Sequence, residues 1–201
     1  MNLTSLGSTN KQPQNLLNLK KNDMLDLTKV APSLRNVILG AGWDAAVRGA
    51  TLDLDIAAFL LDGNDRVANI STDVIYFNNM SSTGIRLEGD NLTGDGEGDD
   101  ERIDIDLSII PSNISRIVFF VTIYNAEAKK QTFGMVNNSY VRLLDADNNE
   151  KEVLRYELKG KYSTDTALTF AELIREGRGW TFHAIGEGSV GDLNTLLSRY
   201  I

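Results

Sequence analysis

Hydrophobic and polar residues follow strand-like patterns in several short runs of the 201-residue chain. They alternate with a period of two in Leu52–Ile56 and Ile103–Leu107, and Ile117–Ile123 is almost continuously apolar. Such runs are typical of β-strands with one or both faces buried. Turn-forming residues separate them, as at Asp62–Asn64 and Pro111–Asn113. The pattern therefore predicts a mainly β fold, a two-sheet antiparallel β-sandwich.

Helical signals are confined to the end of the chain. Ser163 is a candidate N-cap and Gly177 a candidate stop, and between them apolar residues recur on one helical face, at Ala167, Phe170, Ala171 and Ile174. A second helix is expected from Asp192 to Arg199. The sequence thus predicts one or two short C-terminal helices beside the sandwich.

Residues 1–15 are rich in Ser, Thr, Asn and Gln and have no periodic apolar pattern, which is typical of a flexible leader. We therefore expect one packed domain over residues 16–201. The first residues lack the basic start and apolar core of a secretory signal, and no apolar run approaches the ~20 residues of a membrane helix. The chain also has no cysteine, which fits a reducing compartment, so a cytoplasmic location is expected.

Negative charge is concentrated in one segment. The chain has a formal net charge of −8, which argues against nucleic acid or an anionic membrane surface as a partner. Between Glu88 and Asp106 lie nine acids and one base, so this window alone carries the whole net charge. Two carboxylates about 4 Å apart repel by roughly 1 kcal/mol in bulk water and roughly 4 kcal/mol near a protein surface.

Two interpretations of this acidic segment remain open. It can be a solvated loop that stays extended, or a cation can lie among its carboxylates. Glycine alternates with acids in Gly89–Glu101, and glycine allows sharp bends that turn main-chain carbonyls inward. Carboxylate, Asn and carbonyl oxygens are the ligands of Ca²⁺, which favours the cation.

The segment does not match an EF-hand loop. If Asp90 is position one, Leu92 and Gly94 stand where oxygen ligands belong. A second near match, Asp145–Glu150, also fails, and we interpret it as a polar hairpin loop between two strands.

Asp53 and Asp55 are a further candidate pair. If their apolar neighbours face the core, both carboxylates point to the opposite face, roughly 7 Å apart along the strand. They can serve one ion site or simply face water.

Other chemistry has little support. Without cysteine, thiolate sites and cysteine nucleophiles are excluded, and His183 is the single histidine. His183 lies in an apolar run, as expected of a histidine at the edge of the core. Gly186–Gly191 matches a dinucleotide-binding glycine pattern, but the chain ends too soon for the rest of such a site, and a tight strand-to-helix turn is expected instead.

Several motifs together resemble the TerD family of tellurium-resistance and general stress proteins. The resemblance covers about residues 16–201 and is carried by the glycine–acid string Gly89–Glu101, by the Gly-Trp-Asp signature within Val37–Asp44, and by Leu52–Leu61, Ile123–Glu127, Gln131–Gly134 and Ser163–Ala167. It implies a calcium-binding β-sandwich of the bacterial cytoplasm, with protein partners that include a membrane protein of the same system.

The resemblance also implies a ligand set. By position, the calcium-associated residues of the family fall on Asp53, Asp55, Asp90, Asn91, Asp99, Asp100 and Glu101, with Gly96 as a carbonyl donor. We expect one or two Ca²⁺ ions to order the 89–101 loop against the Asp53/Asp55 strand and form a partner-binding surface, without catalysis, nucleic acid or membrane insertion. The alternative is a metal-dependent hydrolase that uses the same acidic site, with His183 or a spare carboxylate as base.

Overall fold

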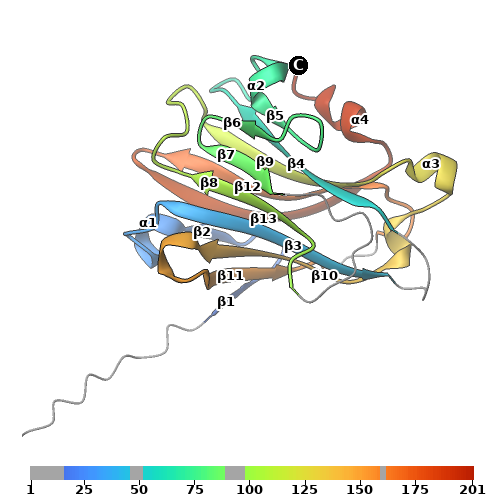
Figure 1. The fold of residues 1–201 in the computed structure, drawn as a ribbon, viewed down its shortest axis with the longest axis horizontal. Coiled ribbons are helices and arrows are strands. Elements are labelled where there is room, and N and C mark those ends of the chain that lie inside the picture. Colours follow the sequence, from blue (N-terminus) through green and yellow to red (C-terminus); the bar gives the residue numbers. More distant parts are fainter. Residues whose placement is uncertain (1–15, 46–51, 89–97, 159–161) are drawn as a thin grey trace, which may run out of the picture.

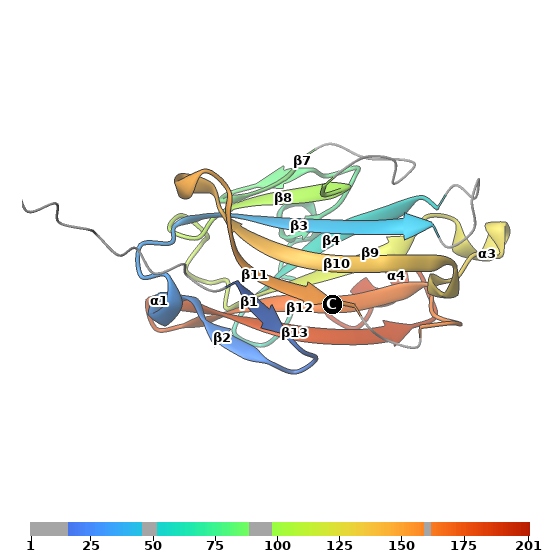
Figure 2. The same ribbon diagram turned by 90° about the horizontal axis from the view of Figure 1, so that it is seen from below.

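Two β-sheets packed face to face form the molecule, which confirms the predicted β-sandwich (Figures 1 and 2). The computed structural model describes residues 16–45, 52–88, 98–158 and 162–201. The expected leader, residues 1–15, lies outside the described residues, as do the acidic residues from 89 to 97.

Sheet A carries the acidic segment. Its strands in spatial order are β1 (Leu17–Leu19), β11 (Lys151–Glu157), β10 (Val136–Asp145), β3 (Asn36–Ala45), β8 (Glu101–Asp106), β7 (Ile85–Glu88) and β6 (Ser81–Ser82). Sheet B consists of β2 (Met24–Asp26), β13 (Gly179–Ser189), β12 (Ala167–Glu176), β9 (Arg116–Ile123), β4 (Leu54–Leu61) and β5 (Val74–Ile75). Neighbouring strands are antiparallel except for β1 and β11, which are parallel.

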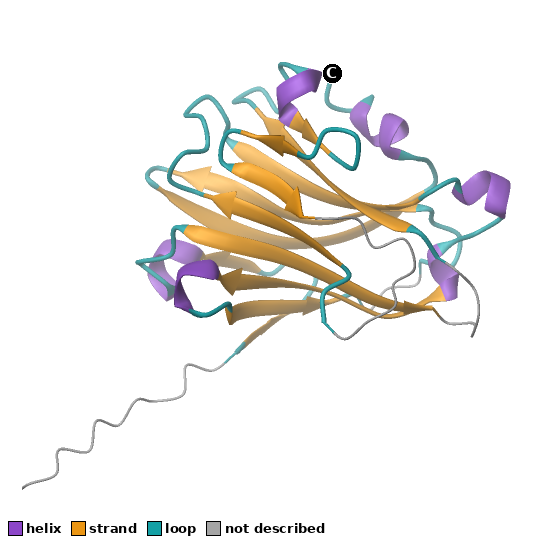
Figure 3. Cartoon of the chain, in the orientation of Figure 1, coloured by secondary structure: helices purple, strands orange, loops and turns teal. Residues whose placement is uncertain are grey.

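Short helices lie at the ends of the strands (Figure 3). They are α1 (Leu27–Val30), α2 (Ile70–Asp73), α3 (Ala126–Lys129) and α4 (Leu193–Leu197), with 3₁₀ turns η1 (Phe133–Met135) and η2 (Ala146–Asn148). Within the described ranges, no helix has the length and apolar character needed to cross a membrane.

The core lies between the sheets and follows the predicted alternation. In β8, Ile103 and Ile105 point inward and Asp104 points out. Strand β4 is buried on both faces, because Leu54, Ile56 and Leu60 enter the core while Phe59 packs on the outer face of sheet B in a second cluster that includes Leu196 of α4. The acidic strand β8 and the Asp55 strand β4 are thus both fixed by apolar packing.

The predicted helix over 163–177 is wrong, because most of this segment is strand β12. A β-bulge between Thr169 and Ala171 breaks the period of two, so Phe170 and Ala171 both enter the core. The strand also carries apolar residues on both of its faces. Together with the bulge, this places apolar residues three and four positions apart in the sequence, which is the spacing that a helix with one apolar face would show. Gly177, with φ 62°, does end the element, but as part of the hairpin turn to β13.

The predictions for the last residues of the chain and for the Asp145–Glu150 loop agree better with the structure. The second predicted helix is confirmed as α4, which begins at an Asp192–Thr195 capping box. Strand β13 runs through the first glycines of Gly186–Gly191, so the expected turn is shorter than predicted. The hairpin predicted at Asp145–Glu150 is confirmed, because η2 connects the paired strands β10 and β11.

Candidate functional site

From here on, the acidic segment means the glycine–acid string Gly89–Glu101, and its C-terminal end, Gly98–Glu101, leads into strand β8 of sheet A. Of the residues expected to bind calcium, Asp53, Asp55, Asp99, Asp100 and Glu101 lie in the described part of the chain. The other three, Asp90, Asn91 and Gly96, lie outside the described residues.

The Asp99 side chain folds back onto the outer face of sheet A. It is 2% exposed, and Nε of Arg142 donates to its Oδ1 at 2.7 Å. The Tyr140 hydroxyl lies 3.2 Å from the same oxygen. The carboxylate lies over Gly40 of β3, where an added Cβ would come within 2.3 Å of it. A glycine at position 40 is therefore what allows Asp99 to reach the surface of the sheet.

Tyr140 uses the second glycine of β3 in the same way. Its ring lies over Gly42, where a Cβ would come within 2.6 Å. Its hydroxyl donates to the carbonyl oxygen of Gly98 at 2.7 Å. Burial, followed by the nearby Asp99 charge, raises the pKa of Tyr140 above its ordinary value, so the phenol stays protonated and can donate at neutral pH. The Gly-Ala-Gly stretch of the sequence signature thus provides a flat surface for the end of the acidic segment.

Asp100 continues the backbone pairing of β8 with β3 by one residue. Its main-chain N–H donates to the carbonyl of Ala41 at 2.8 Å, and its Oδ2 accepts from the main-chain N–H of Trp43 at 2.8 Å. Both contacts involve the backbone of β3, so the position of this carboxylate is set by the sheet.

Glu101 connects the two sheets. Its side chain points into the sandwich, the residue is 3% exposed, and Oε2 accepts from the main-chain N–H of Ile56 at 2.8 Å. Ile56 lies in β4, directly after Asp55. The C-terminal end of the acidic segment is therefore joined to strand β4, which includes Asp55, by a buried hydrogen bond.

Asp53 and Asp55 are both shielded from water. Asp55 is 9% exposed, so the open alternative that it simply faces water does not hold. The Asp53 side chain is 17% exposed, and one of its oxygens lies 3.6 Å from Nζ of Lys129 at the end of α3. Across the described ranges of the chain, no three acidic or histidine side chains converge closely enough to hold a metal ion.

His183 lies apart from the acidic segment, on β13 of sheet B. Its Nδ1 is 2.7 Å from Oε1 of Glu172, and the other oxygen of Glu172 pairs with Arg116. The side chain of His183 is 23% exposed, in agreement with the predicted position at the edge of the core.

Glu88 and Asp104 are a pair of interacting acids that the sequence alone did not predict. Glu88 ends β7, and Asp104 lies on the outward face of the neighbouring strand β8. Partial burial, together with the hydrogen bond and the charge of Glu88, raises the pKa of Asp104 above its ordinary value. The concentration of acids between Glu88 and Asp106 indicated that some carboxylates would lie close together. Only the pairing of β7 with β8 shows that Glu88 and Asp104 do so.

We expect the Asp104→Asn variant to unfold at higher urea concentration than the wild type at pH 7. The raised pKa of Asp104 means that its stabilising contribution is complete below pH 3.8, the ordinary value, and is lost as pH rises through the folded value. The stability gained by the Asp104→Asn variant should therefore disappear at pH 3, where Asp104 of the wild type is protonated in both the folded and the unfolded state. Urea titrations with a chelator at the two pH values measure the difference.

Asp106→Asn is the matched control on the same strand face. Hydrogen bonds from Ser108 lower the pKa of Asp106, so its contribution is present above the ordinary value and is lost as pH falls. This variant should be less stable than the wild type at pH 7. A result of the same sign for both variants would contradict the assignment of opposite pKa shifts.

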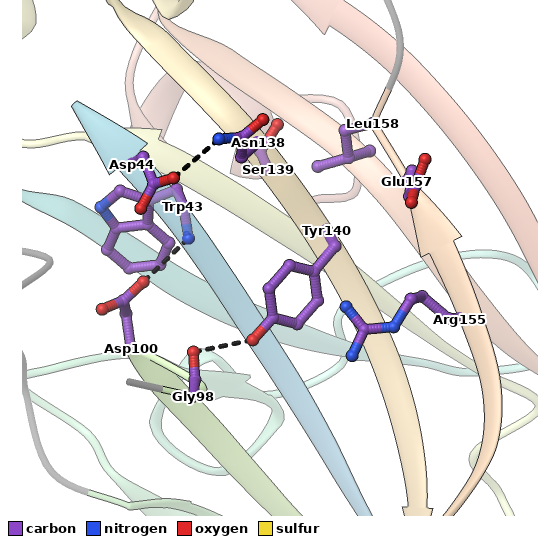
Figure 4. Close-up of a pocket in the computed structure, with 10 residues that line it drawn as sticks. All are labelled: Trp43, Asp44, Gly98, Asp100, Asn138, Ser139, Tyr140, Arg155, Glu157 and Leu158. Atoms are coloured by element: carbon purple, nitrogen blue, oxygen red, sulfur yellow. Dashed lines mark hydrogen bonds between the residues drawn. The ribbon is translucent and has the colours of Figure 1, made fainter. Parts of the chain in front are cut away.

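A cavity of about 490 Å³ opens beside the end of the acidic segment (Figure 4). We call it the Tyr140 pocket, and its lining includes Trp43, Asp44, Asp100, Tyr140, Arg155 and Glu157. Asn138, also in the lining, donates from Nδ2 to Oδ2 of Asp44 at 2.8 Å. The pocket thus combines the Tyr140 ring with carboxylates from two strands, β3 and β11, and from the β3–β8 junction.

Comparison with known proteins gives a consistent result. A family model described as the TerD domain matches residues 16–200. "Tellurium resistance protein TerD" of Serratia marcescens is 43% identical over 187 residues, covering 92% of this chain and 96% of that protein. "Stress response protein SCP2" of Bacillus subtilis (strain 168) is 38% identical over 200 residues, covering 92% and 99%. A crystal structure described as "unknown function protein SAV2460" matches with a TM-score of 0.67 and 29% identity, covering 82% of this chain and 95% of that one.

Proposed function

Because the chain belongs to the TerD family of tellurium-resistance and stress-response proteins, we propose that it is a non-enzymatic calcium-binding module whose ion organises a surface for protein partners. One observation carries the proposal. The glycine–acid string Gly89–Glu101 lies within the window that holds the entire net charge of the chain, and it ends in three consecutive acids, each fixed to a different part of the sandwich.

The chemistry of the donors fits calcium. Every expected ligand offers oxygen, from a carboxylate, an amide side chain or a main-chain carbonyl, and calcium takes six to eight oxygen ligands. A carboxylate can accept from several partners at once, so N–H contacts such as that of Ile56 with Glu101 are compatible with a metal ligand role. The residues that would hold the ion are Asp53, Asp55, Asp90, Asn91, Gly96, Asp99, Asp100 and Glu101, for one or two ions.

The chain's own residues would position such an ion rather than react. Arg142 and Tyr140 hold Asp99 on sheet A, and the Glu101–Ile56 hydrogen bond keeps the segment against β4. Bound calcium would supply positive charge that offsets the repulsion among the acids. The partners of such a surface would be other proteins of the same stress system.

No observation favours the alternative of a metal-dependent hydrolase. Its candidate bases are His183 or a spare carboxylate, and His183 would need to lie beside the ion. His183 is on strand β13 of sheet B, between β2 and β12, and is engaged by Glu172, whereas Asp99 and Asp100 lie on sheet A.

Calcium should raise the thermal unfolding midpoint of the protein. Binding to the native state alone adds RT ln(1 + [L]/Kd), which is about 2.7 kcal/mol at a calcium concentration of 100 Kd. Calorimetric scans with a chelator, with calcium, and with magnesium at equal ionic strength test this. No shift at millimolar calcium would reject the proposal.

The Asp53→Asn/Asp55→Asn double variant should lose the calcium-dependent part of this shift. Glu187→Gln, which neutralises an exposed acid on β13 outside the proposed site, is the control and should keep it. Titration calorimetry then gives the number of ions. Equal calcium responses of both variants would remove the Asp53/Asp55 strand from the site.

A further inference from the structure

A second, smaller pocket lies at the other end of strand β8 from the acidic segment. Its volume is about 170 Å³. Leu107 of its lining follows the last residue of β8, whereas the acidic segment leads into the first. Because the six residues of this strand span roughly 20 Å, the pocket is well separated from the proposed calcium site. We call it the Arg178 pocket, and its lining includes Leu27, Thr28, Arg35, Leu107, Arg178 and Trp180.

The Arg178 pocket is formed where helix α1 packs against the start of β13 (Figures 1 and 2). A Cβ added to Gly179 would come within 2.0 Å of Oγ1 of Thr28, so the glycine is what allows this close approach. The floor of the pocket is apolar and closed, because Leu27, Leu107 and Trp180 are each at most 8% exposed. Polar contacts with a ligand would therefore come from the rim.

The rim of this pocket is positively charged. Among the described residues that line it, two are arginines and none is acidic. Arg35 directly precedes β3, Arg178 lies in the turn before β13, and both side chains are exposed. Across the described parts of the chain, neither guanidinium forms a hydrogen bond or an ion pair. A chain with a net charge of −8 thus places two positive charges without a paired acid around one pocket.

Two carboxylates near the pocket are bound by other groups. Arg35 contributes to the lowered pKa of Asp106, but the largest cause is the Ser108 hydroxyl, and Oδ1 of Asp106 accepts from the Ser108 main-chain N–H and Oγ at 2.9 and 2.5 Å. Glu176, in the strand before the turn, accepts from Oγ1 of Thr181 at 2.8 Å. The donors of the two rim guanidiniums therefore remain available to a ligand.

We infer that the Arg178 pocket binds a small oxyanion of the phosphate class. A guanidinium presents N–H donors in a planar fork that matches two oxygens of a phosphoryl group. An anion in the pocket would lie within reach of both Arg35 and Arg178 and would offset the repulsion between them. The hydroxyl of Thr28, also in the lining, can donate a further hydrogen bond. This site is independent of the proposed calcium site, with which it shares no residue.

The size of the pocket limits the ligand. Sites for drug-sized molecules begin at roughly 300 Å³, so a volume of about 170 Å³ is too small to enclose a nucleotide. At roughly 30 Å³ for each water molecule, it has room for about six, which is enough for a phosphate ion. The phosphoryl group can belong to free phosphate or to a phosphorylated side chain that reaches in from the rim.

Nuclear magnetic resonance titration with inorganic phosphate tests the inference. The protein is freed of calcium on a chelating resin, so that neither calcium phosphate nor a soluble chelator interferes, and sodium chloride keeps the ionic strength constant. Of the two tryptophans of the chain, Trp180 lines the pocket and Trp43 lies near the far end of β3. We expect phosphate to shift the Trp180 indole and Gly179 amide signals saturably and to leave Trp43 unchanged. No saturable shift of Trp180 at millimolar phosphate, or equal shifts of both indoles, would overturn the inference.

Two double variants separate the pocket from general attraction to positive charge. Arg35→Gln/Arg178→Gln should weaken phosphate binding by about ten-fold, as expected for two exposed charge-assisted contacts. Arg66→Gln/Arg199→Gln is the charge-matched control, because it neutralises two exposed arginines on adjoining segments outside the pocket lining. The control should bind phosphate like the wild type. Equal weakening by the two double variants would contradict a specific site.

Two further probes identify the ligand. Acetate carries negative charge without a phosphoryl group, and binding of acetate as tight as that of phosphate would overturn the assignment to phosphate. Acetyl-phosphoserine-N-methylamide distinguishes the sources of the phosphoryl group. Tighter binding of inorganic phosphate assigns the pocket to the free ion, and tighter binding of the phosphoserine probe assigns it to a phosphorylated side chain. Because all titrations use calcium-free protein, their result does not depend on the outcome of the calcium experiments.

Discussion

Replacing Arg142 by leucine should lower the free energy of unfolding by about 3 kcal/mol in the absence of calcium. The change removes the cation that contacts Asp99, a carboxylate whose side chain is only 2% exposed. Removing one partner of a buried pair costs about 3–5 kcal/mol, and the 24% exposure of the Arg142 side chain argues for the lower end. Urea unfolding in chelator measures the loss as a lower midpoint with an unchanged slope.

Arg142→Lys is the matched control, since it keeps the charge but loses the planar donor group, and it should be affected less. The Asp99→Asn/Arg142→Leu double variant should recover part of the loss, because no uncompensated charge is then buried. If Asp99 also binds calcium, saturating calcium should reduce the destabilisation of Arg142→Leu. Additive effects of the two single changes would show that Arg142 does not act through Asp99.

The sheet architecture could be predicted from the sequence because burial produces local periodicity. Ile103 and Ile105 alternate with polar residues along one strand, and both side chains point into the core, as a period of two requires. Strand β12 shows where this reasoning fails. Its bulge places Phe170 and Ala171 in the core together, and periodicity within one strand carries no information about a bulge in its pairing.

The acidic segment could be found from composition, but its attachments could not. Arg142 and Tyr140 lie about forty residues after Asp99 along the chain and meet it only through the pairing of β3 with β10 and β8. The glycines at positions 40 and 42 gave a signal, because two glycines on one face of a strand indicate close approach by another group. Identifying that group as Asp99 and the Tyr140 ring requires the register of the sheet.

Replacing Glu101 by alanine should lower the free energy of unfolding by about 3 kcal/mol, because a buried N–H then loses a charged acceptor. The acceptor is Oε2, 2.8 Å from the main-chain nitrogen of Ile56, and the residue is 3% exposed. Strand β5 pairs only with Ala58 and Phe59 of β4, so within the described strands it does not supply an alternative acceptor for Ile56. The change should therefore loosen β4 next to Asp55 as well as destabilise the whole domain.

Glu101→Gln separates the structural role of Glu101 from metal binding. Glutamine keeps an acceptor for Ile56, so most of the stability should remain, whereas loss of the negative charge should weaken calcium binding. Hydrogen exchange reports the hydrogen bond directly, and the Ile56 amide should exchange faster in the alanine variant than in the glutamine variant. Equal protection of Ile56 in both variants would mean that the contact between the sheets does not depend on Glu101. In that case the acidic segment would be joined to β4 by other groups, and the Glu101–Ile56 contact would no longer support the proposed calcium site.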